Sequence, residues 1–335
     1  MDSPISVMAS NLPQPFMHPD LAQVHSQLPQ NDEIGTPEAL ANRRRFLNFT
    51  LEDTLRGRED VIAHEEREIP GPTGPLTASI FRPKKTAEST QQQPQTQTLG
   101  ILHIHGGGHC SGNRFLGIAS ALDWVEELGA VVVSAEYRLA PEHPQPAQLE
   151  DSYAALEWLS GHAQELGVSA DHIVVCGGSA GGNLAAGVVL LARDRSGPKI
   201  RGQLLMCPWL DDSNATGSMR QLGHLAPWTL SNSVHACDYA LGVDRRHATM
   251  YTVPARADDL RGLPPTFMDV GDADVFRDED VAYAAALWKA GVSTELHVWA
   301  GCWHSFDIFV PDAPISHRAR GLRSTWLRQL VSNRD

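Results

Sequence analysis

The sequence predicts an α/β fold in which a mostly parallel central sheet carries helices on both faces. From Leu99 to the end of the chain, short apolar runs alternate with helix-length stretches, as in sheets built from strand–helix–strand units. The short runs are apolar at nearly every position, which is typical of strands buried on both faces. The chain has 335 residues, 42% of them hydrophobic, which is enough for one large domain with an added subdomain.

The first sixty residues are polar and contain several prolines. The run Thr36-Pro37-Glu38 is a helix-capping pattern, so we predict a helical stretch from there to about Leu55. Its basic cluster, Arg43-Arg44-Arg45, is expected to form a solvated face of that helix.

Two alternating runs, 65–69 and 76–81, flank the Pro/Gly-rich segment 70–75 and predict a β-hairpin. The polar, Gln-rich run 86–98 predicts a surface loop. Beyond it, the pattern predicts strands at 99–104, 130–135, 172–176, 202–207, 265–270 and 294–299, and helices at 115–128, 149–162, 182–193, 279–290 and 316–331.

Residues 211–262 interrupt this alternation because they contain no strong strand pattern. An insertion of this size at one edge of a regular α/β core is more often a cap over a site than a linker. We therefore expect the segment to cover a binding site.

Composition excludes several classes of partner. The net charge of −13 gives the chain no general attraction to nucleic acid or to an anionic membrane.

The five cysteines are odd in number and scattered, and none of them forms a C-x-x-C pair, so neither a disulfide framework nor a zinc ribbon is expected. Cys176 and Cys207 are expected to be buried thiols. The sequence shows neither a signal-peptide pattern nor a membrane-length apolar run, which predicts a cytoplasmic protein.

The segment from Gly177 to Gly181 presents one serine among small residues. Gly177, Ser179 and Gly181 satisfy G-x-S-x-G, a strand-to-helix turn that holds a serine in a strained, exposed position. An apolar run precedes the turn and an Ala/Leu/Val-rich stretch follows it, so a plain small-residue turn is the weaker alternative. No lysine follows the glycines, which argues against a phosphate-binding loop. The pattern predicts that Ser179 is a nucleophile.

The segment His105-Gly106-Gly107-Gly108 follows the first predicted parallel strand. Segments of this type supply backbone N–H groups to an oxyanion hole, and the N–H of Ala180 is the remaining donor. His103, His105 and His109 could instead be metal ligands, but no aspartate accompanies them and a metal site does not need three glycines. We therefore expect no metal and no cofactor, with His105 bracing the loop and His109 at the rim of the substrate pocket.

A nucleophilic serine needs a base and a group that orients the base. His304 lies in a loop beyond the last predicted strand, which suits the base, whereas His297 lies within that strand. Several carboxylates follow the strand at 265–270, where catalytic residues of open α/β sheets gather. Asp272 and Asp274 both remain candidates, because spacing alone does not separate them.

The chain resembles the hormone-sensitive lipase family of α/β-hydrolases. Four segments carry the resemblance, and they are His105–Gly108, the run Tyr137-Arg138-Leu139-Ala140-Pro141-Glu142-His143, Gly177–Gly182, and Asp274–Glu279 followed by His304. It implies an α/β-hydrolase fold, a catalytic triad of Ser179, Asp274 and His304, and oxyanion donors at Gly107, Gly108 and Ala180. It also implies a helical cap formed by 1–60 and the insertion 211–262, over a core formed by 61–210 and 263–335.

Two positions depart from the family pattern. Gly178 stands where the family usually has an acidic residue, and His109 stands where an aromatic residue is common. Because neither belongs to the triad, we expect altered local contacts rather than loss of activity.

The predicted function is that of a serine carboxylesterase that cleaves small to medium esters through an acyl-enzyme on Ser179. The same triad could instead hydrolyse amides or thioesters or transfer an acyl group in a biosynthetic pathway, and a non-catalytic small-molecule receptor is the alternative outside catalysis. We expect His109, Trp209 and Trp228 to contact substrate, although the tryptophans suit a core equally well. A small-molecule ester is the expected partner, and a homodimer is compatible with the sequence.

Overall fold

The computed structural model describes residues 13–28, 33–84, 98–225, 227–246 and 248–332, and its centre is an eight-stranded sheet. The strand order is β1-β2-β4-β3-β5-β6-β7-β8. The strands from β3 to β8 pair in parallel, whereas β1 pairs with β2 and β2 with β4 in antiparallel fashion. The predicted fold class, a mostly parallel sheet with helices on both faces, is confirmed.

The elements follow one another along the chain with these bounds. The strands are β1 (Ile62–Gly71), β2 (Gly74–Pro83), β3 (Gly100–Ile104), β4 (Val131–Ala135), β5 (Ile173–Gly178), β6 (Gly202–Met206), β7 (Thr266–Gly271) and β8 (Thr294–Trp299). The helices are α2 (Pro19–Gln27), α3 (Pro37–Phe46), α4 (Leu51–Leu55), α5 (Ala119–Leu128), α6 (Ala147–Gly161), α7 (Ala163–Leu166), α8 (Ala180–Asp194), α9 (Gly217–Leu222), α10 (Leu230–Leu241), the 3₁₀ turn η2 (Pro254–Arg256), α11 (Arg277–Lys289), α12 (Phe306–Phe309) and α13 (Pro314–Ser332).

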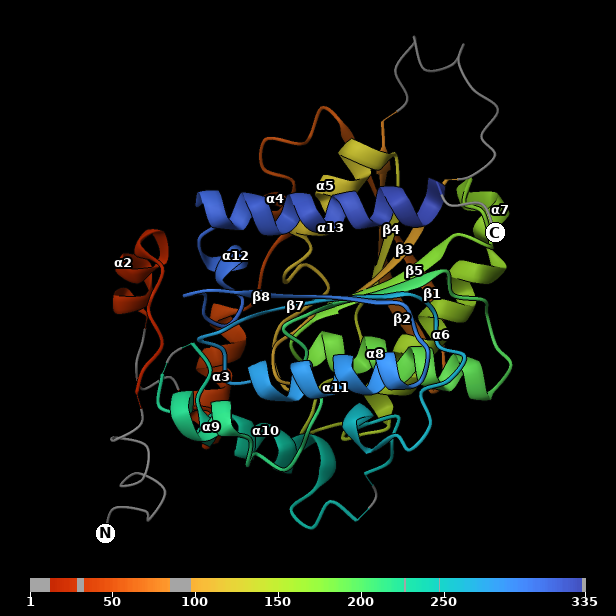
Figure 1. Ribbon diagram of the computed structural model, residues 1–335. Helices are drawn as coiled ribbons and strands as arrows, with labels where there is room; N and C mark the ends of the chain where they lie inside the picture. Colours follow the sequence, from red (N-terminus) through yellow and green to blue (C-terminus); the bar gives the residue numbers. More distant parts are fainter. Residues whose placement is uncertain (1–12, 29–32, 85–97, 226, 247, 333–335) are drawn as a thin grey trace.

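Helices cover both faces of the sheet, with α5 and α13 on one side and α6, α8 and α11 on the other (Figure 1). Neighbouring residues of each strand point to opposite faces. Val132 and Val174 therefore join the core beneath α5 and α13, whereas Val133 and Val175 join the core beneath α6, α8 and α11. This explains why the parallel strands are apolar at nearly every position.

The predicted hairpin is confirmed, and its strands are longer than expected. β1 and β2 pair from Ile62 with Pro83 to Gly71 with Gly74, so the pairing continues into the Pro/Gly-rich segment. The tight turn after Gly71 closes the hairpin, while the predicted loop at 86–98 lies outside the described residues except for its last position.

The N-terminal region differs from the prediction. The expected helical stretch over 36–55 is two helices. α3 ends at Phe46, and Thr50 caps the start of α4 with a reciprocal pair of hydrogen bonds to Asp53. Helix α2 is not among the elements predicted from the sequence. Proline is well suited to the first turn of a helix, and Leu21 anchors α2 in a small apolar cluster. Helix α5 begins at Ala119 rather than at 115.

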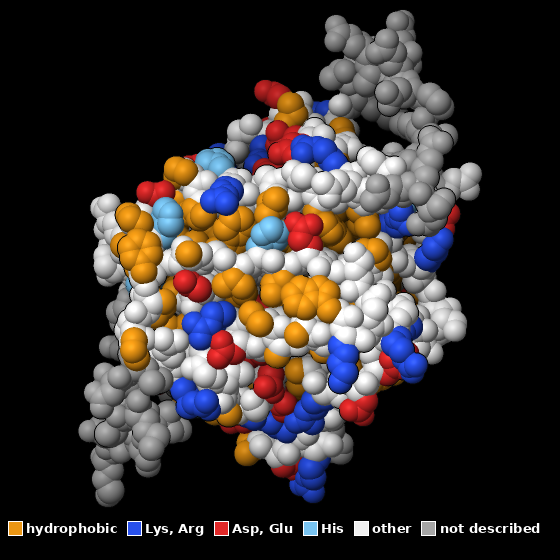
Figure 2. All heavy atoms as spheres, viewed as in Figure 1, with side chains coloured by type: hydrophobic (Ala, Val, Ile, Leu, Met, Phe, Trp, Pro, Cys, Tyr) orange, Lys and Arg blue, Asp and Glu red, His pale blue; other side chains and the backbone are white. Residues whose placement is uncertain are grey.

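Hydrophobic side chains gather on the face shown in Figure 2, where α13, β8 and α11 lie toward the viewer, and charges of both signs are interspersed among them. Val281, Trp288 and Val298 on α11 and β8 are exposed. β8 is the last strand of the sheet, so this edge has no neighbouring strand in the described chain.

The cysteines are free and buried. Cys176 lies in the core as expected, whereas Cys207 also contacts the pocket described below. Within the described ranges, none of the helices has both the length and the apolar character required to cross a bilayer.

Candidate active site

Ser179 occupies a tight turn between β5 and α8. Its backbone angles, φ 56° and ψ −123°, lie in a region that non-glycine residues rarely adopt. The turn is held because the Ser179 N–H donates to the carbonyl of Met206 at 2.9 Å and the Ser179 carbonyl accepts from Trp209 at 3.0 Å. The backbone thus fixes the direction of the Ser179 side chain.

Glycine is required on both sides of the serine for steric reasons. A Cβ on Gly177 would lie 2.2 Å from the carbonyl oxygen of Gly181, and a Cβ on Gly181 would lie 2.1 Å from that of Ile104. A Cβ on Gly178 would meet only ordinary contacts, the nearest being the Met206 carbonyl oxygen at 3.6 Å. The absence of a side chain at position 178 is therefore not a steric requirement of the turn.

Three side chains from three strand ends form a chain of hydrogen bonds. His304 Nε2 lies 3.0 Å from Ser179 Oγ, and His304 Nδ1 lies 2.8 Å from Asp274 Oδ2. The second oxygen of Asp274 accepts the N–H of Phe276 at 3.0 Å, which fixes the carboxylate. Asp274 is fully buried, and His304 and Ser179 are nearly so.

The carboxylate controls the charge of the imidazole. Burial alone disfavours the imidazolium, but the Asp274 carboxylate outweighs it and raises the pKa of His304 well above its ordinary value. Asp272, the other candidate, accepts the N–H of Gly301 at 2.6 Å instead of contacting the imidazole. Of the two aspartates, Asp274 is thus the one that the structure brings to His304.

The glycine loop after β3 faces Ser179. Gly107 and Gly108 line the same pocket as Ser179 and have φ values of 104° and 64°. The Gly107 carbonyl accepts from Ser111 Oγ at 2.7 Å, and the His105 ring bonds the Gly106 carbonyl at 2.8 Å while stacking on Tyr137. These contacts fix the conformation of the loop, so its backbone has a defined position beside Ser179.

Ser179 opens into an apolar cavity with a volume of about 380 Å³. Its walls come from α3, the glycine loop, the end of β6 and α12, and Trp228 closes one side. Sequence reasoning missed most of these wall residues because each lies in a separate segment with no motif. They include Phe46, Phe49, Leu116, Met206, Ile308 and Phe309.

Comparisons with known proteins agree with this geometry. Residues 101–308 match the family model of the alpha/beta hydrolase fold. The chain is 34% identical to Esterase LipI of Mycobacterium tuberculosis over 258 residues, which cover 76% of this chain and 78% of the relative. It is 37% identical to Carboxylesterase NlhH of the same species over 226 residues, covering 66% and 70%. This chain belongs to the alpha/beta hydrolase family.

Solved structures support the same assignment for this hydrolase. The structure titled Bacterial Heroin Esterase superposes with a TM-score of 0.85 at 34% identity, covering 95% of this chain and 98% of that one. Esterase LipW of Mycobacterium marinum gives a TM-score of 0.80 at 30% identity, covering 96% and 99%. The predicted membership of the hormone-sensitive lipase family is confirmed, and the reaction class is carboxylic ester hydrolysis.

Not every predicted contact residue lies where the sequence suggested. His109 is not at the pocket rim, because it is fully buried with its ring 5.0 Å from that of Trp209, and burial lowers its pKa to about 3. Trp209 borders only a small recess beside Ser179 and Ala180, whereas Trp228 borders both that recess and the main cavity.

The side chains of His103, His105 and His109, at the end of β3 and in the glycine loop, do not form a group close enough to share one ion. The ring of His103 lies 3.2 Å from Ser134 Oγ, and His105 and His109 have the separate contacts given above. Within the part of the chain that the structure describes, the group of His, Cys and carboxylate side chains close enough to share an ion is Cys207, Asp274 and His304.

The arginine cluster of α3 is not a solvated face, which corrects the prediction. Arg43 is buried, lines the cavity, and lies over the Trp228 ring at 5.6 Å. Arg44 donates to the carbonyls of Cys110 and Ala140 and pairs with Glu142. Arg44 thus joins α3 to the glycine loop, and Arg43 joins it to Trp228 of the insertion, although these segments lie far apart in sequence.

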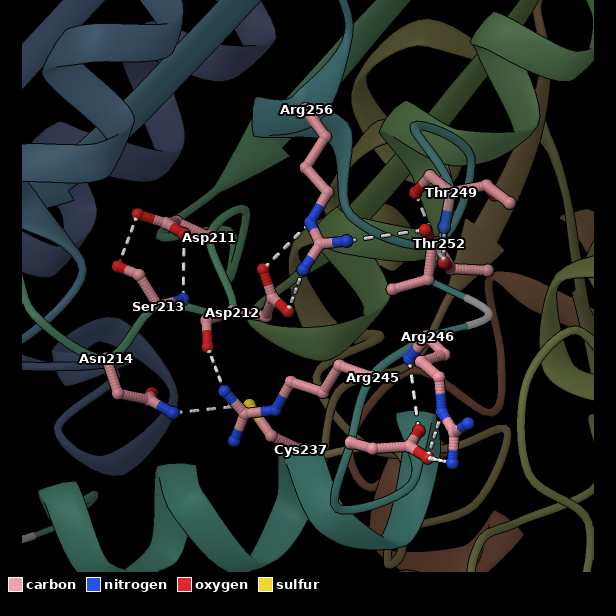
Figure 3. A network of polar contacts seen from close by, with 12 residues as sticks. Asp211, Asp212, Ser213, Asn214, Cys237, Arg245, Arg246, Thr249, Thr252 and Arg256 are labelled. Carbon is pink, nitrogen blue, oxygen red and sulfur yellow. Dashed lines mark hydrogen bonds and ion pairs between the residues drawn. The ribbon is translucent and has the colours of Figure 1, made fainter.

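A polar network joins separate segments of the insertion to one another (Figure 3). Arg256 binds both carboxylate oxygens of Asp212, at 3.1 and 2.6 Å, and Arg245 donates to the Asp212 carbonyl. Asp212 is buried, and a forked pair of this kind fixes both position and orientation. The network holds the segment that leads into η2, and η2 itself, against the first residues of the insertion.

Proposed function

We propose that the protein is a serine carboxylesterase in which Ser179 is the nucleophile, His304 the general base and Asp274 the residue that orients the base. The observation that carries the proposal is the continuous hydrogen-bond chain from Asp274 through His304 to Ser179, at the floor of an apolar cavity. The geometry suits acyl transfer because each group lies within hydrogen-bonding reach of the next.

The reaction proceeds in two halves. Ser179 Oγ attacks the ester carbonyl carbon while its proton passes to His304 Nε2, and the resulting tetrahedral species collapses when His304 returns that proton to the departing alcohol oxygen. Water then attacks the acyl-enzyme, with its proton taken up by the same nitrogen, and the carboxylic acid leaves as Ser179 regains a proton. Asp274 accepts a hydrogen bond from His304 Nδ1 and stabilises the imidazolium in both halves.

The oxyanion of each tetrahedral species is proposed to bind the backbone N–H groups of Gly107, Gly108 and Ala180. Gly107 and Gly108 line the cavity beside Ser179, and Ala180 is the first residue of α8, where N–H groups have no partner within the helix. None of these N–H groups is a donor in the backbone hydrogen bonds of the described loops and turns. Fixed donors of this kind stabilise charge that develops only in the transition state.

Helix α3 and the insertion are proposed to form a cap that sets the size of the substrate. Both contribute walls to the cavity, and its apolar lining favours small to medium hydrophobic esters. A charged substrate would lose hydration in such a cavity without full compensation. A homodimer, the lack of nucleic-acid partners and a cytoplasmic location stay predictions from the sequence.

A panel of p-nitrophenyl esters of increasing acyl length tests the proposal, run on the wild type and on Ser179→Ala. We expect turnover of short and medium esters that falls for long chains, and loss of turnover by about 10⁴-fold or more in the variant. Equal rates in the two proteins would exclude Ser179 as the nucleophile. Hydrolysis of amides or thioesters alone would change the substrate class but not the mechanism.

A further inference from the structure

Cys207 places a thiol beside the triad, where the esterase mechanism does not use one. The residue directly follows β6 and lines the cavity with Ser179 and His304. Its Sγ, a carboxylate oxygen of Asp274 and a ring nitrogen of His304 all lie within 4.8 Å of one another, and all three residues are buried.

The backbone conformation of Cys207 places its thiol beside Asp274 and His304. Cys207 has φ 37°, a left-handed value that is unusual for a residue with a side chain. Its N–H donates to the Asp269 carbonyl at 2.7 Å, and its sulfur lies 3.6 Å from Ser305 Oγ. The position of the sulfur is therefore defined by the end of β6 and by the loop that carries His304.

The three donors form a ligand set that suits a zinc ion. Zn²⁺ binds cysteine sulfur at about 2.3 Å, histidine nitrogen at about 2.0–2.1 Å and carboxylate oxygen at about 2.0–2.2 Å, so ligand atoms in a tetrahedral site lie about 3.3–3.8 Å apart. A group already within 4.8 Å needs only small side-chain movements to reach this geometry. Cys207 and His304 line the cavity, from which water can supply a fourth ligand.

We propose that Cys207, Asp274 and His304 form an inhibitory binding site for thiophilic divalent cations, represented by Zn²⁺. The ion binds His304 Nδ1, and the single ring proton of the neutral imidazole moves from Nδ1 to Nε2. The Cys207 thiol binds as the thiolate after it releases its proton to solvent. With its proton on Nε2, His304 donates toward Ser179 and no longer accepts the serine proton. Because binding releases protons, it strengthens as pH rises.

Inhibition by the ion rests on the proposed esterase function, whereas binding of the ion to these three residues does not depend on that function. Binding is therefore measured first, with Co²⁺ as a spectroscopic probe of the full-length protein, because a thiolate bound to Co²⁺ gives a charge-transfer absorption band. The wild type is compared with Cys207→Ser and with Cys237→Ser, which changes a buried cysteine outside the cavity. We expect the band in the wild type and in Cys237→Ser, and its absence in Cys207→Ser.

Esterase turnover is then measured against Zn²⁺ concentration, with each variant referred to its own rate in the presence of EDTA. We expect Zn²⁺ to inhibit the wild type reversibly, and the half-inhibiting concentration to rise by about tenfold or more in Cys207→Ser, since even changes outside the ligand sphere produce losses of that size. A thiolate band that persists in Cys207→Ser, or equal inhibition of all three proteins, would overturn the proposal. Absence of turnover in every protein would refute the esterase function and leave the Co²⁺ result to decide the site.

Discussion

The Nε2 atom of His304 lies 3.0 Å from the Oγ of Ser179, although 125 positions separate the two residues in sequence. The contact forms because β5 and β8 lie in one sheet and release their chains at the same edge. Asp274 follows β7 at that edge and completes the chain of hydrogen bonds. The order of the strands thus assembles the site from three distant segments.

The acid limb of the pH–rate profile should report the charge of His304. Since the Asp274 carboxylate raises the pKa of His304 above its ordinary value, the neutral base becomes available only at higher pH. We expect kcat/KM to rise with pH to a midpoint above about 6.5, the unperturbed value. In Asp274→Asn the rate should fall by about 10³–10⁴-fold and the midpoint should move to lower pH.

Asp272→Asn is the matched control for that experiment, because Asp272 is a neighbouring carboxylate that bonds Gly301 and not His304. Its profile should keep the wild-type midpoint. A midpoint that moves equally in both aspartate variants would show that Asp274 has no special relation to the base.

The glycines around Ser179 should differ sharply in their tolerance of a methyl group. Gly181→Ala places a Cβ 2.1 Å from the Ile104 carbonyl oxygen, so we expect a loss of about 3 kcal/mol or more in unfolding free energy and loss of turnover. Gly178→Ala meets nothing closer than 3.6 Å and should stay within about 1 kcal/mol of the wild type. Denaturant unfolding and ester turnover measure both, and similar losses in the two variants would contradict the geometry.

Asp280 is a fully buried carboxyl in the first turn of α11, and neither of its oxygens has a hydrogen-bond partner among the described residues. Burial and the nearby Glu279 and Asp274 carboxylates raise the pKa of Asp280 well above its ordinary value. Between the unfolded and the folded pKa the native state holds more protons, so this group lowers stability as pH rises. We expect Asp280→Asn to raise the melting temperature, and to raise it more at pH 8 than at pH 5.

Thermal unfolding at both pH values tests this expectation, with Asp258→Asn as a control because Asp258 is exposed. The control should leave the melting temperature unchanged. A destabilised Asp280→Asn, or a gain that does not depend on pH, would mean that burial of the carboxyl does not cost stability.

The sequence was sufficient for the sheet and for the placement of Ser179 and His304, because strand ends and glycine turns leave local patterns. The choice of Asp274 over Asp272 needed the family resemblance, since both follow the same strand and only the tertiary structure shows which one reaches His304. Local information is enough where backbone geometry dictates residue type, and it is not enough where two similar residues differ only in their distant partner.

At Arg43 the local sequence predicts the wrong environment. A run of three arginines suggests a solvated surface, yet the Arg43 side chain is buried against Trp228, a residue 185 positions away. Helix α2 is similar, because its position depends on the hydrogen bond between the His18 N–H and the Gly301 carbonyl at 2.9 Å. Contacts between the N-terminal helices and later segments leave no local pattern, and so the walls of the cavity could not be predicted.

Covalent labelling tests the central claim most directly. A fluorophosphonate probe reacts with a serine only when a neighbouring base activates it, and mass spectrometry of the digested protein locates the adduct. We predict one adduct on Ser179 in the wild type, none at that position in Ser179→Ala, and strongly slowed labelling in His304→Ala. An unlabelled Ser179 in the folded wild type, or labelling at an unchanged rate in His304→Ala, would contradict the proposed triad.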